Sequence, residues 1–268
     1  MGELPAVSVV MPIDRVHPYL SLTLDSVAAQ AYPNFELLIV CSSDLEAELV
    51  GLLERHGGGF RYRVIGTRLN GFCFALNLAI NASTAPYIAR WDSDDLSDPD
   101  RFARQVAEFE ARPRLAVLGT RGVITDKDGR ITAEFPFYGT NKAIRRAMKY
   151  RPPLMHSSIM FRASVLLEQQ GYGYGYTSED HELYLRLARR NDIEFGCLPD
   201  VRTYYRRHDY QRTSVPRYYD QFADIAGFMT TAFLHSGSPL HLLGIAAKVP
   251  PVRKIYERMR SLWRGHHP

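Results

Sequence analysis

The chain has 268 residues, a formal net charge of +4 at pH 7 and three cysteines. This length suits one large domain, or one domain with an appendage. A nearly balanced charge argues against bulk nucleic-acid binding. Three cysteines without metal-ligand spacing argue against a disulfide framework and favour a reducing, cytoplasmic setting. The sequence has neither a secretory leader pattern nor an apolar run of roughly 18 residues, so we expect no bilayer-spanning helix.

Apolar segments alternate regularly through the first half of the chain. We expect strands at residues 7–11, 35–40, 62–65, 87–91 and 115–120,. We expect helices at residues 19–30, 46–55, 75–82 and 101–111,. Asp98 and Pro99 resemble the N-cap and first position of the last of these helices. The alternation predicts an α/β fold of Rossmann-like type, with a mostly parallel central sheet flanked by helices.

The second half of the chain differs in character, beginning at the pair Pro152 and Pro153. Residues 126–129 form a turn signal, and a Gly-Tyr repeat occupies residues 171–176,. We expect a helix at residues 181–190, short strands at 194–198 and 201–205, and a final basic helix after residue 251. Three units follow from this division: residues 1–120, residues 121–215, and a helical, basic extension at 216–268.

The segment 87–95 is the most informative part of the sequence. A β-branched and aromatic run ends there in Asp92, Asp94 and Asp95. A strand that ends in Asp-x-Asp places carboxylates at the carboxyl edge of a sheet, where open α/β folds bind ligands. Clustered carboxylates favour a cation, and their oxygen ligands suit Mg²⁺ or Mn²⁺, with positions left open for substrate phosphates. The alternative is a solvated turn in which Asp98 caps the next helix.

Several motifs occur in an order that resembles a known family. They are "VSVVMP", "YLSLTLDSVAAQAYPNFELLIV", "ALNLAINASTAPYIARWDSDDLSDPDRF", "HSSIMFR", "SEDHELYLRLARR" and "YRRH". Together they resemble the landmarks of inverting, GT-A-fold glycosyltransferases of family two, a large family of bacterial polysaccharide enzymes. The resemblance covers residues from about 7 to about 208. A single Asp-x-Asp recurs by chance on many loops, whereas the ordered set is specific.

The resemblance implies that residues 1–120 form the nucleotide-sugar-binding half and residues 121–215 the acceptor-binding and catalytic half. It also implies a role for each acidic landmark. Asp94 would ligate the metal that bridges the two phosphates of the donor, and Asp92 would contact the metal or the ribose. His208 would be a further contact to the metal or the diphosphate, unless it is a surface or packing residue. Asp180 would be the general base that deprotonates the acceptor hydroxyl, with Glu179 as the alternative. Both acids also suit the N-terminus of a helix through its dipole.

The donor side departs from the family pattern in two places. Asp14 and Arg15 replace a Tyr-Asn pair, and Ser42 lies where the family has an aspartate that binds the donor's base. A serine hydroxyl still forms a hydrogen bond but lacks the charge. We hypothesise that Asp14 contacts the base instead. The full set of residues assigned to the donor is Pro12, Asp14, Ser42, Asn70, Asn77, Asp92 and Arg206; the two asparagines are alternatively turn caps, and Arg206 alternatively belongs to a solvated loop.

The function that the resemblance implies is a metal-dependent, inverting transfer of a hexosyl group. The donor would be a nucleotide-diphosphate sugar, specifically a UDP-sugar. The acceptor would be a polyprenyl-diphosphate-linked saccharide in O-antigen, capsule or exopolysaccharide synthesis. Two alternatives are a catalytically inactive homologue that binds nucleotide sugars or scaffolds a complex, and a nucleotidyltransferase. The latter normally needs a glycine-rich basic loop after the first strand, and residues 12–16 do not provide one.

Two further segments suggest contacts on the acceptor side. The tyrosines of the 171–176 repeat offer faces on which a sugar ring can stack, or they pack on the core. The basic C-terminal helix carries Ile255, Met259, Leu262 and Trp263, a pattern that suits an anionic membrane surface as well as a helix packed on the domain,. The expected location is therefore cytoplasmic, with peripheral contact at the inner face of the plasma membrane. The basic residues concerned are Lys248, Arg253, Lys254, Arg258, Arg260 and Arg264.

Overall fold

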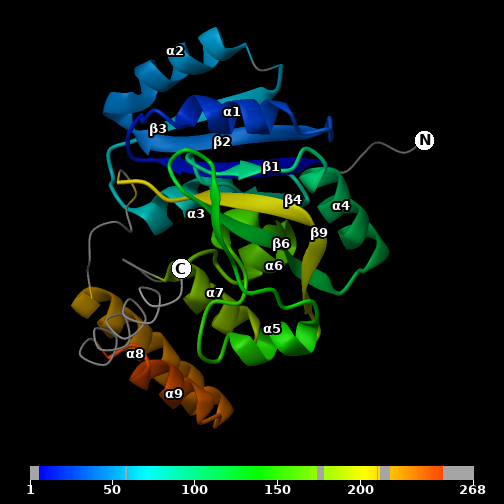
Figure 1. The fold of residues 1–268 in the computed structure, drawn as a ribbon, viewed down its shortest axis with the longest axis vertical. Helices are drawn as coiled ribbons and strands as arrows, with labels where there is room; N and C mark the ends of the chain where they lie inside the picture. Colours follow the sequence, from blue (N-terminus) through cyan, green and yellow to red (C-terminus); the bar gives the residue numbers. More distant parts are fainter. Residues whose placement is uncertain (1–5, 58, 174–177, 210, 212–217, 250–268) are drawn as a thin grey trace.

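A mixed sheet runs through the centre of the molecule (Figure 1). The structure, a computed structural model, describes residues 6–57, 59–173, 178–209, 211 and 218–249. Within these residues nine strands form the sheet, in the order β3-β2-β1-β4-β8-β6-β9-β5, with β7 paired to β6. The predicted α/β fold is confirmed, with helices packed on both faces of the sheet.

The first four strands are parallel, and helices connect them in sequence. The strands are β1 (Val7–Ile13), β2 (Phe35–Ser42), β3 (Arg61–Thr67) and β4 (Tyr87–Arg90). The connecting elements are α1 (Leu20–Ala28), the 3-10 turn η1 (Ser43–Leu45), α2 (Glu46–His56) and α3 (Phe72–Ala82). Each prediction from the apolar periodicity is confirmed here, with ends that differ by a few residues.

Two apolar layers enclose this half of the sheet. Val9 and Val10 are neighbours on β1 and therefore point to opposite faces. Val10 packs with Leu76 of α3 in one layer, and Val9 packs with Leu24 of α1 in the other. Burial on both faces explains why these strands appear as continuous apolar runs rather than as alternating patterns.

The remaining strands complete the sheet in a mixed arrangement. They are β5 (Leu96–Ser97), β6 (Leu115–Thr125), β7 (Ile131–Glu134), β8 (Met160–Arg162) and β9 (Glu194–Arg206). Strand β8 runs antiparallel between β4 and β6, and β9 runs parallel to β6. The helices of this half are α4 (Arg101–Ala111), α5 (Asn141–Ala147), η2 (His156–Ser158), α6 (Ala163–Glu168) and α7 (Glu179–Leu187).

Two local predictions in this half are wrong. The two short strands expected at 194–198 and 201–205 are one strand, β9, whose register with β6 shifts between the pairs Thr120–Leu198 and Arg121–Arg202. The intervening residues, which include Pro199, are absorbed as an irregularity rather than a turn. Asp98 does not cap α4: the N-cap residue is Asp100, and the Asp98 carboxylate accepts hydrogen bonds from Arg202 N (2.9 Å) and Tyr204 Oη (3.1 Å). Asp98 therefore ties the segment between β5 and α4 to β9.

Helices α8 (Tyr218–Ser236) and α9 (Leu240–Ala246) form a helical hairpin at the lower end of the molecule in Figure 1. The hairpin packs on α7, where the His181 ring lies edge-on to Phe228 with 5.3 Å between ring centroids. In the described part of the chain, every helix is too short or too polar to cross a bilayer. The basic helix expected after residue 251 lies outside the described residues.

His181 gives this region a pH-dependent stability. Its ring is 1% exposed, and its Nε2 donates to Met148 O at 2.5 Å. Burial lowers its pKa from 6.5 to about 4, with smaller contributions from the charges of Lys248 and His241. As the pH is lowered, His181 becomes protonated in the unfolded chain near pH 6.5 but in the folded protein only near pH 4. The free energy of unfolding should therefore fall by about 3 kcal/mol in total between these two pH values.

Urea denaturation at pH 7 and pH 5 measures this effect. We expect His181→Gln to flatten the pH dependence, while the exposed His235 replaced by Gln keeps the dependence of the parent protein. An unchanged dependence in His181→Gln would assign the effect to other groups.

Candidate functional site

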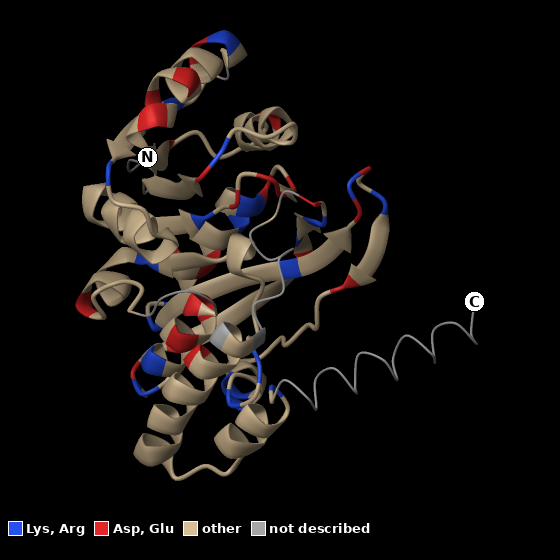
Figure 2. Ribbon diagram, turned by 90° about the vertical axis from the view of Figure 1, so that its left-hand side faces the viewer, with Lys and Arg blue, Asp and Glu red and all other residues tan. Residues whose placement is uncertain are grey.

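The acidic loop after β4 gives each of its three carboxylates a different partner. Asp92 forms an ion pair with the buried Arg90. Asp94 faces His208, and Asp95 bonds the backbone of Arg206. Acidic and basic residues alternate along the loops at this edge of the sheet (Figure 2). The sequence places the loop here because β1 and β4 are parallel neighbours whose carboxyl ends share one edge,.

Asp95 is the structural member of the loop. Its side chain is fully buried, and its Oδ1 accepts a hydrogen bond from Arg206 N at 3.0 Å. Its backbone oxygen accepts from Trp91 Nε1 at 3.0 Å, and the buried Arg101 guanidinium stacks 4.9 Å from the Trp91 ring centroid. Burial, followed by the charges of Asp94 and Asp92, raises the Asp95 pKa well above its ordinary value. Asp95 therefore fixes the loop to the end of β9.

Asp94 and His208 are brought together from positions 114 residues apart. The His208 Nε2 lies 2.9 Å from the Asp94 Oδ2, and Gln211 Nε2 donates to the same oxygen at 3.4 Å. Burial and the charge of Asp92 raise the Asp94 pKa, while His208 acts in the opposite direction. Asp94 and His208, both of which the sequence assigns to a metal, therefore lie side by side. His208 is not a surface residue, since its side chain is 2% exposed.

The chemistry of this pair fits a divalent ion that also binds substrate. In the part of the chain that the structure describes, no group of three or more His, Cys, Asp or Glu side chains is arranged to hold a metal. Asp92, the third residue assigned, is committed to Arg90. Mg²⁺ is commonly held by one or two carboxylates and completes its shell with substrate phosphates and water. Asp94 could supply the carboxylate of such a partial ligand set, and the His208 imidazole lies beside it.

Two aromatic residues that follow β1 surround His208 and were missed in the sequence. The Tyr19 ring lies 4.5 Å from the His208 ring centroid, and the His17 ring lies 5.8 Å away. His17 Nε2 is also 3.0 Å from Ser93 Oγ, within the acidic loop. The available signal was their place just after the first strand, at the same sheet edge as Asp94.

Arg206 is buried and holds this edge together. Its guanidinium donates to Asp94 O at 3.3 Å and to Lys127 O at 3.0 Å, and it lies 5.0 Å from the Tyr19 ring centroid. The alternative of a solvated basic loop is wrong for Arg206, which is 5% exposed. Arg206 therefore lies beside Asp94, where the sequence assigns the donor phosphates.

Helix α7 presents Glu179 and Asp180 differently. Glu179 is 5% exposed, and its Oε1 lies 3.7 Å from His156 Nδ1. Asp180 is half-buried, and its Oδ1 accepts a hydrogen bond from His181 N at 2.8 Å. Ser178, just before the helix, has a φ of 62°, a left-handed conformation that is uncommon outside glycine,. Asp180 is thus the more accessible of the two predicted bases.

The chain before α7 is held by α3. Asn77 Nδ2 donates to Tyr172 O at 2.8 Å, and Tyr172 N donates to Asn77 Oδ1 at 2.8 Å. Gly171 has a φ of 66°, and a Cβ at that position would lie 2.2 Å from Asn77 Oδ1. The Asn77 amide, which the sequence assigns to the donor, therefore forms a clamp on this segment. Tyr172 packs in the core, while Tyr174 and Tyr176 lie outside the described residues.

A series of contacts connects the acidic loop with the start of α7. The Arg90 guanidinium, paired with Asp92, lies 5.3 Å from the Phe72 ring centroid. The Phe72 ring is 6.4 Å from the His156 ring, and His156 contacts Glu179. The charges of Arg90, Glu179 and Asp180 all act on the pKa of Tyr172, which burial raises. One set of side chains therefore links the acidic loop, through Asp92, with the start of α7, through Glu179.

The other residues assigned to the donor follow adjacent strands. Strands β1 and β2 pair Ile13 with Cys41, so Asp14, directly after β1, and Ser42, the last residue of β2, lie at neighbouring strand ends. Asp14 is exposed and lies 3.4 Å from Arg15, measured from Oδ2 to Nη2. Pro12 pairs with Val40 within β1 and β2, and Asn70 is exposed after β3.

The sequence matches a known family over most of this region. Residues 8–168, more than half of the chain, match the family model described as Glycosyl transferase family 2. The O-antigen biosynthesis glycosyltransferase WbnJ of Escherichia coli is 29% identical over 208 residues, covering 77% of this chain and 81% of the relative. "Putative glycosyltransferase EpsE" of Bacillus subtilis (strain 168) is 31% identical over 196 residues, covering 69% and 68%.

A third relative is more distant and more fully named. It is the UDP-Gal:alpha-D-GlcNAc-diphosphoundecaprenol beta-1,3-galactosyltransferase of Escherichia coli. This relative is 25% identical over 199 residues, which cover 68% of this chain and 65% of the relative.

Solved structures share the fold at low sequence identity. TarS 1-349 of S. aureus, in complex with UDP-GlcNAc, aligns with a TM-score of 0.65 at 17% identity, covering 84% of this chain and 66% of that one. The mannosyltransferase PcManGT of Pyrobaculum calidifontis, in complex with GDP-Man and Mn²⁺, aligns with a TM-score of 0.60 at 17% identity, covering 97% and 81%. These likenesses confirm the GT-A fold. From the family match and the two closer relatives, the chain belongs to glycosyltransferase family 2.

Proposed function

We propose that the protein transfers a sugar from a nucleotide-diphosphate donor, a UDP-sugar, to a saccharide acceptor during cell-surface polysaccharide synthesis. The observation that carries this proposal is the Asp94–His208 pair, at 2.9 Å, at the sheet edge that a series of contacts joins to the helix bearing Asp180. Residues 1–120 supply most of the donor side, and residues 121–215 supply Asp180 and His208.

The donor diphosphate would lie against the acidic loop. Asp94 and His208 would hold Mg²⁺ or Mn²⁺ there, and the bound ion would offset the negative charge that develops on the leaving diphosphate. The structure of PcManGT with Mn²⁺ supports this choice of ion by analogy of fold. Arg206 would steady the loop from behind. Asp92 would contact the ribose or the ion after its ion pair with Arg90 breaks.

The reaction would be a single displacement with inversion at the anomeric carbon. Asp180 would accept the proton of the acceptor hydroxyl while the acceptor oxygen bonds to C1 and the bond from C1 to the diphosphate oxygen breaks. Glu179 is less suited to this role because it is buried beside His156. A base on the opposite side of the sugar from the leaving group gives the inverted configuration.

The nucleobase would lie beyond the ends of β1 and β2. Ser42 would contribute a hydroxyl there, and Asp14, exposed after the adjacent strand, would provide the charged contact that Ser42 lacks,. Asn70 follows the next strand of the same edge. The complex of TarS with UDP-GlcNAc supports a uridine nucleotide by analogy.

The acceptor would be a polyprenyl-diphosphate-linked saccharide at the inner face of the plasma membrane. Two relatives support this assignment through their names: WbnJ in O-antigen biosynthesis, and the galactosyltransferase named for a diphosphoundecaprenol substrate.

Incubation with a panel of UDP-, GDP- and dTDP-sugars and a lipid-linked acceptor tests the proposal. We expect release of nucleoside diphosphate with a UDP-sugar, loss of that release with a chelator, and recovery when Mg²⁺ or Mn²⁺ is added in excess. Release of pyrophosphate would instead identify a nucleotidyltransferase. Donor binding without turnover across the acceptor panel would identify an inactive homologue.

A further inference from the structure

We propose that the face formed by α5 and the α8–α9 hairpin docks on an anionic lipid bilayer. We call it the hairpin face and define it by three exposed leucines and three basic residues. These are Leu234, Leu242, Leu243, Lys142, Arg146 and Lys149. All six belong to the described residues, and none of them is part of the basic segment after residue 251 in the sequence.

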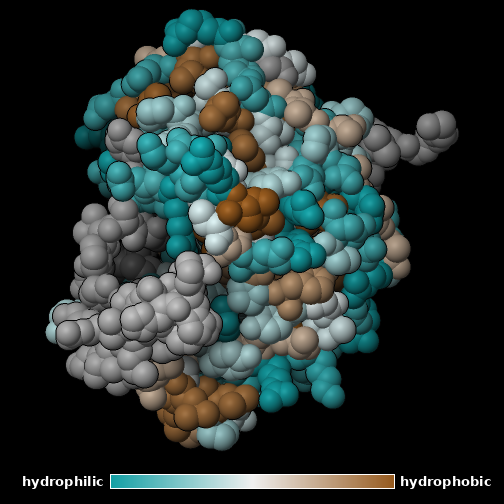
Figure 3. Space-filling model, viewed as in Figure 1, coloured by the Kyte–Doolittle hydropathy of each residue, from teal (hydrophilic) through white to brown (hydrophobic). Residues whose placement is uncertain are grey.

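The apolar part of the hairpin face is exposed and uncharged. Residues 225–247 contain no Asp, Glu, Lys or Arg. Leu234 is 77% exposed, Leu243 62% and Leu242 44%. In Figure 3 an apolar patch covers the lower end of the molecule, over α9. Large apolar side chains that gather on an exposed surface indicate an interaction site.

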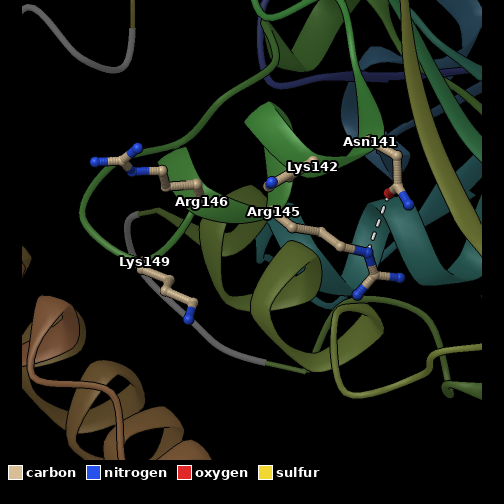
Figure 4. A pocket seen from close by; sticks show the side chains of 5 residues that line it. All are labelled: Asn141, Lys142, Arg145, Arg146 and Lys149. Atoms are coloured by element: carbon tan, nitrogen blue, oxygen red, sulfur yellow. Dashed lines mark hydrogen bonds between the residues drawn. The ribbon is translucent and has the colours of Figure 1, made fainter.

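The basic part of the hairpin face borders this patch. Lys142, Arg146 and Lys149 line a hollow along α5 together with Asn141 and Arg145 (Figure 4). Arg145 turns inward, donating to Asn141 Oδ1 at 3.0 Å and to Ala188 O at 2.8 Å. Residues 135–167 contain no Asp or Glu, so this stretch of the chain supplies no acid that would offset the charge.

Direct contacts make the two parts one surface. Lys149 Nζ donates to Ser238 Oγ at 3.4 Å, in the turn between α8 and α9. Helix α9 packs closely on the segment after α5, because a Cβ on Gly244 would lie 3.0 Å from Tyr150 Cα. The leucines and the basic side chains therefore keep fixed positions relative to each other.

This combination fits a lipid surface better than a protein partner. Lysine is depleted at protein interfaces, and their centres are apolar. Helices that lie in a membrane surface insert leucines, and nearby basic residues attract anionic headgroups. The hairpin has exposed leucines and no Asp, Glu, Lys or Arg at residues 225–247, and three cations border it, so it has both features.

The hairpin face also adjoins the helix of the proposed base. His181, next to Asp180, donates to Met148 O after α5 and lies against Phe228 of α8. The elements that carry the hairpin face therefore contact the first turn of α7, which includes Asp180. In combination with the proposed function, a lipid-linked acceptor would then reach Asp180 without leaving the membrane. The docking itself is independent of that function.

Flotation of the full-length protein with vesicles tests the proposal without any substrate. We expect binding to vesicles of phosphatidylglycerol and phosphatidylcholine, and weak binding to phosphatidylcholine alone. The triple variant Lys142→Gln, Arg146→Gln, Lys149→Gln should bind anionic vesicles on the order of 100-fold more weakly at low salt, from about one kcal/mol per basic residue. The matched control is Arg55→Gln, Arg61→Gln, Arg104→Gln, which removes the same charge from α2, β3 and α4, outside the hairpin face, and should bind like the parent.

A second variant tests the apolar part. Leu234→Ser, Leu242→Ser, Leu243→Ser should weaken vesicle binding and leave the circular dichroism spectrum and the melting temperature unchanged, because these side chains are exposed. Three results would overturn the proposal. The first is equal vesicle binding by the basic triple variant and its control, and the second is loss of binding only when the basic residues after 251 are replaced. The third is a parent protein that does not bind vesicles but forms a dimer, which the leucine variant dissociates.

Discussion

Replacing Asp180 by asparagine should lower kcat by about 10²- to 10⁴-fold, the range of general-base catalysis. The amide cannot take the proton of the acceptor hydroxyl. Its oxygen can still accept the hydrogen bond from His181 N that starts α7, so the fold should be preserved. Donor affinity should change little, because we assign Asp180 to the acceptor side. Nucleoside diphosphate release, together with donor binding by calorimetry, measures both quantities.

Glu179→Gln is the matched comparison for this variant. Glu179 is buried beside His156, so its replacement should lower the melting temperature while kcat changes little. If Glu179→Gln loses activity like a base variant while Asp180→Asn stays active, the roles of the two acids are reversed.

Asp94→Asn should lower kcat/KM by about 10²- to 10³-fold, since a bound metal contributes several kcal/mol to transition-state stabilisation. The variant should also need a higher concentration of Mn²⁺ for half-maximal activity. His208→Gln should raise the Mn²⁺ concentration at half-maximal activity by a smaller amount, because it removes the imidazole and leaves the Asp94 carboxylate. Activity measured against Mn²⁺ concentration separates ion affinity from turnover.

Asp95→Asn provides the control for the acidic loop. Asp95 is buried and bonds Arg206 N, so its replacement should alter thermal stability while the Mn²⁺ concentration at half-maximal activity stays near that of the parent. Full activity of the parent protein in excess chelator would contradict the metal role of Asp94.

The fold was predictable because its signals are local. The strands β1 and β2 are buried on both faces and therefore form continuous apolar runs, and the helices between them show regular spacing. The irregularity around Pro199 was not predictable, because a proline between two apolar runs indicates a turn as readily as a bulge,. Asp98 was misassigned because capping is a local rule, whereas its partners Arg202 and Tyr204 lie more than 100 residues away.

The candidate site was predictable only in part. Asp94 was found from its spacing, but His208 came from the resemblance alone, since spacing cannot predict a contact across 114 residues. His17 and Tyr19 carry no motif, and their contacts with Ser93 and His208 depend on the closed fold. Asn77 was assigned to the donor because its position matches the family, while its partner Tyr172 emerges only in three dimensions.

The clamp between Asn77 and Tyr172 has a consequence for how this protein can change over evolution. The backbone that leads into α7 is anchored to α3, a helix of the opposite half, by two hydrogen bonds at Tyr172, seven residues before α7 begins at Glu179. A change in the tilt of α3 would therefore move Tyr172 with it. With Asp180 as the proposed base, a lineage that remodels α3 would also displace the chain that precedes its proton acceptor, which couples the two sides of the site in evolution.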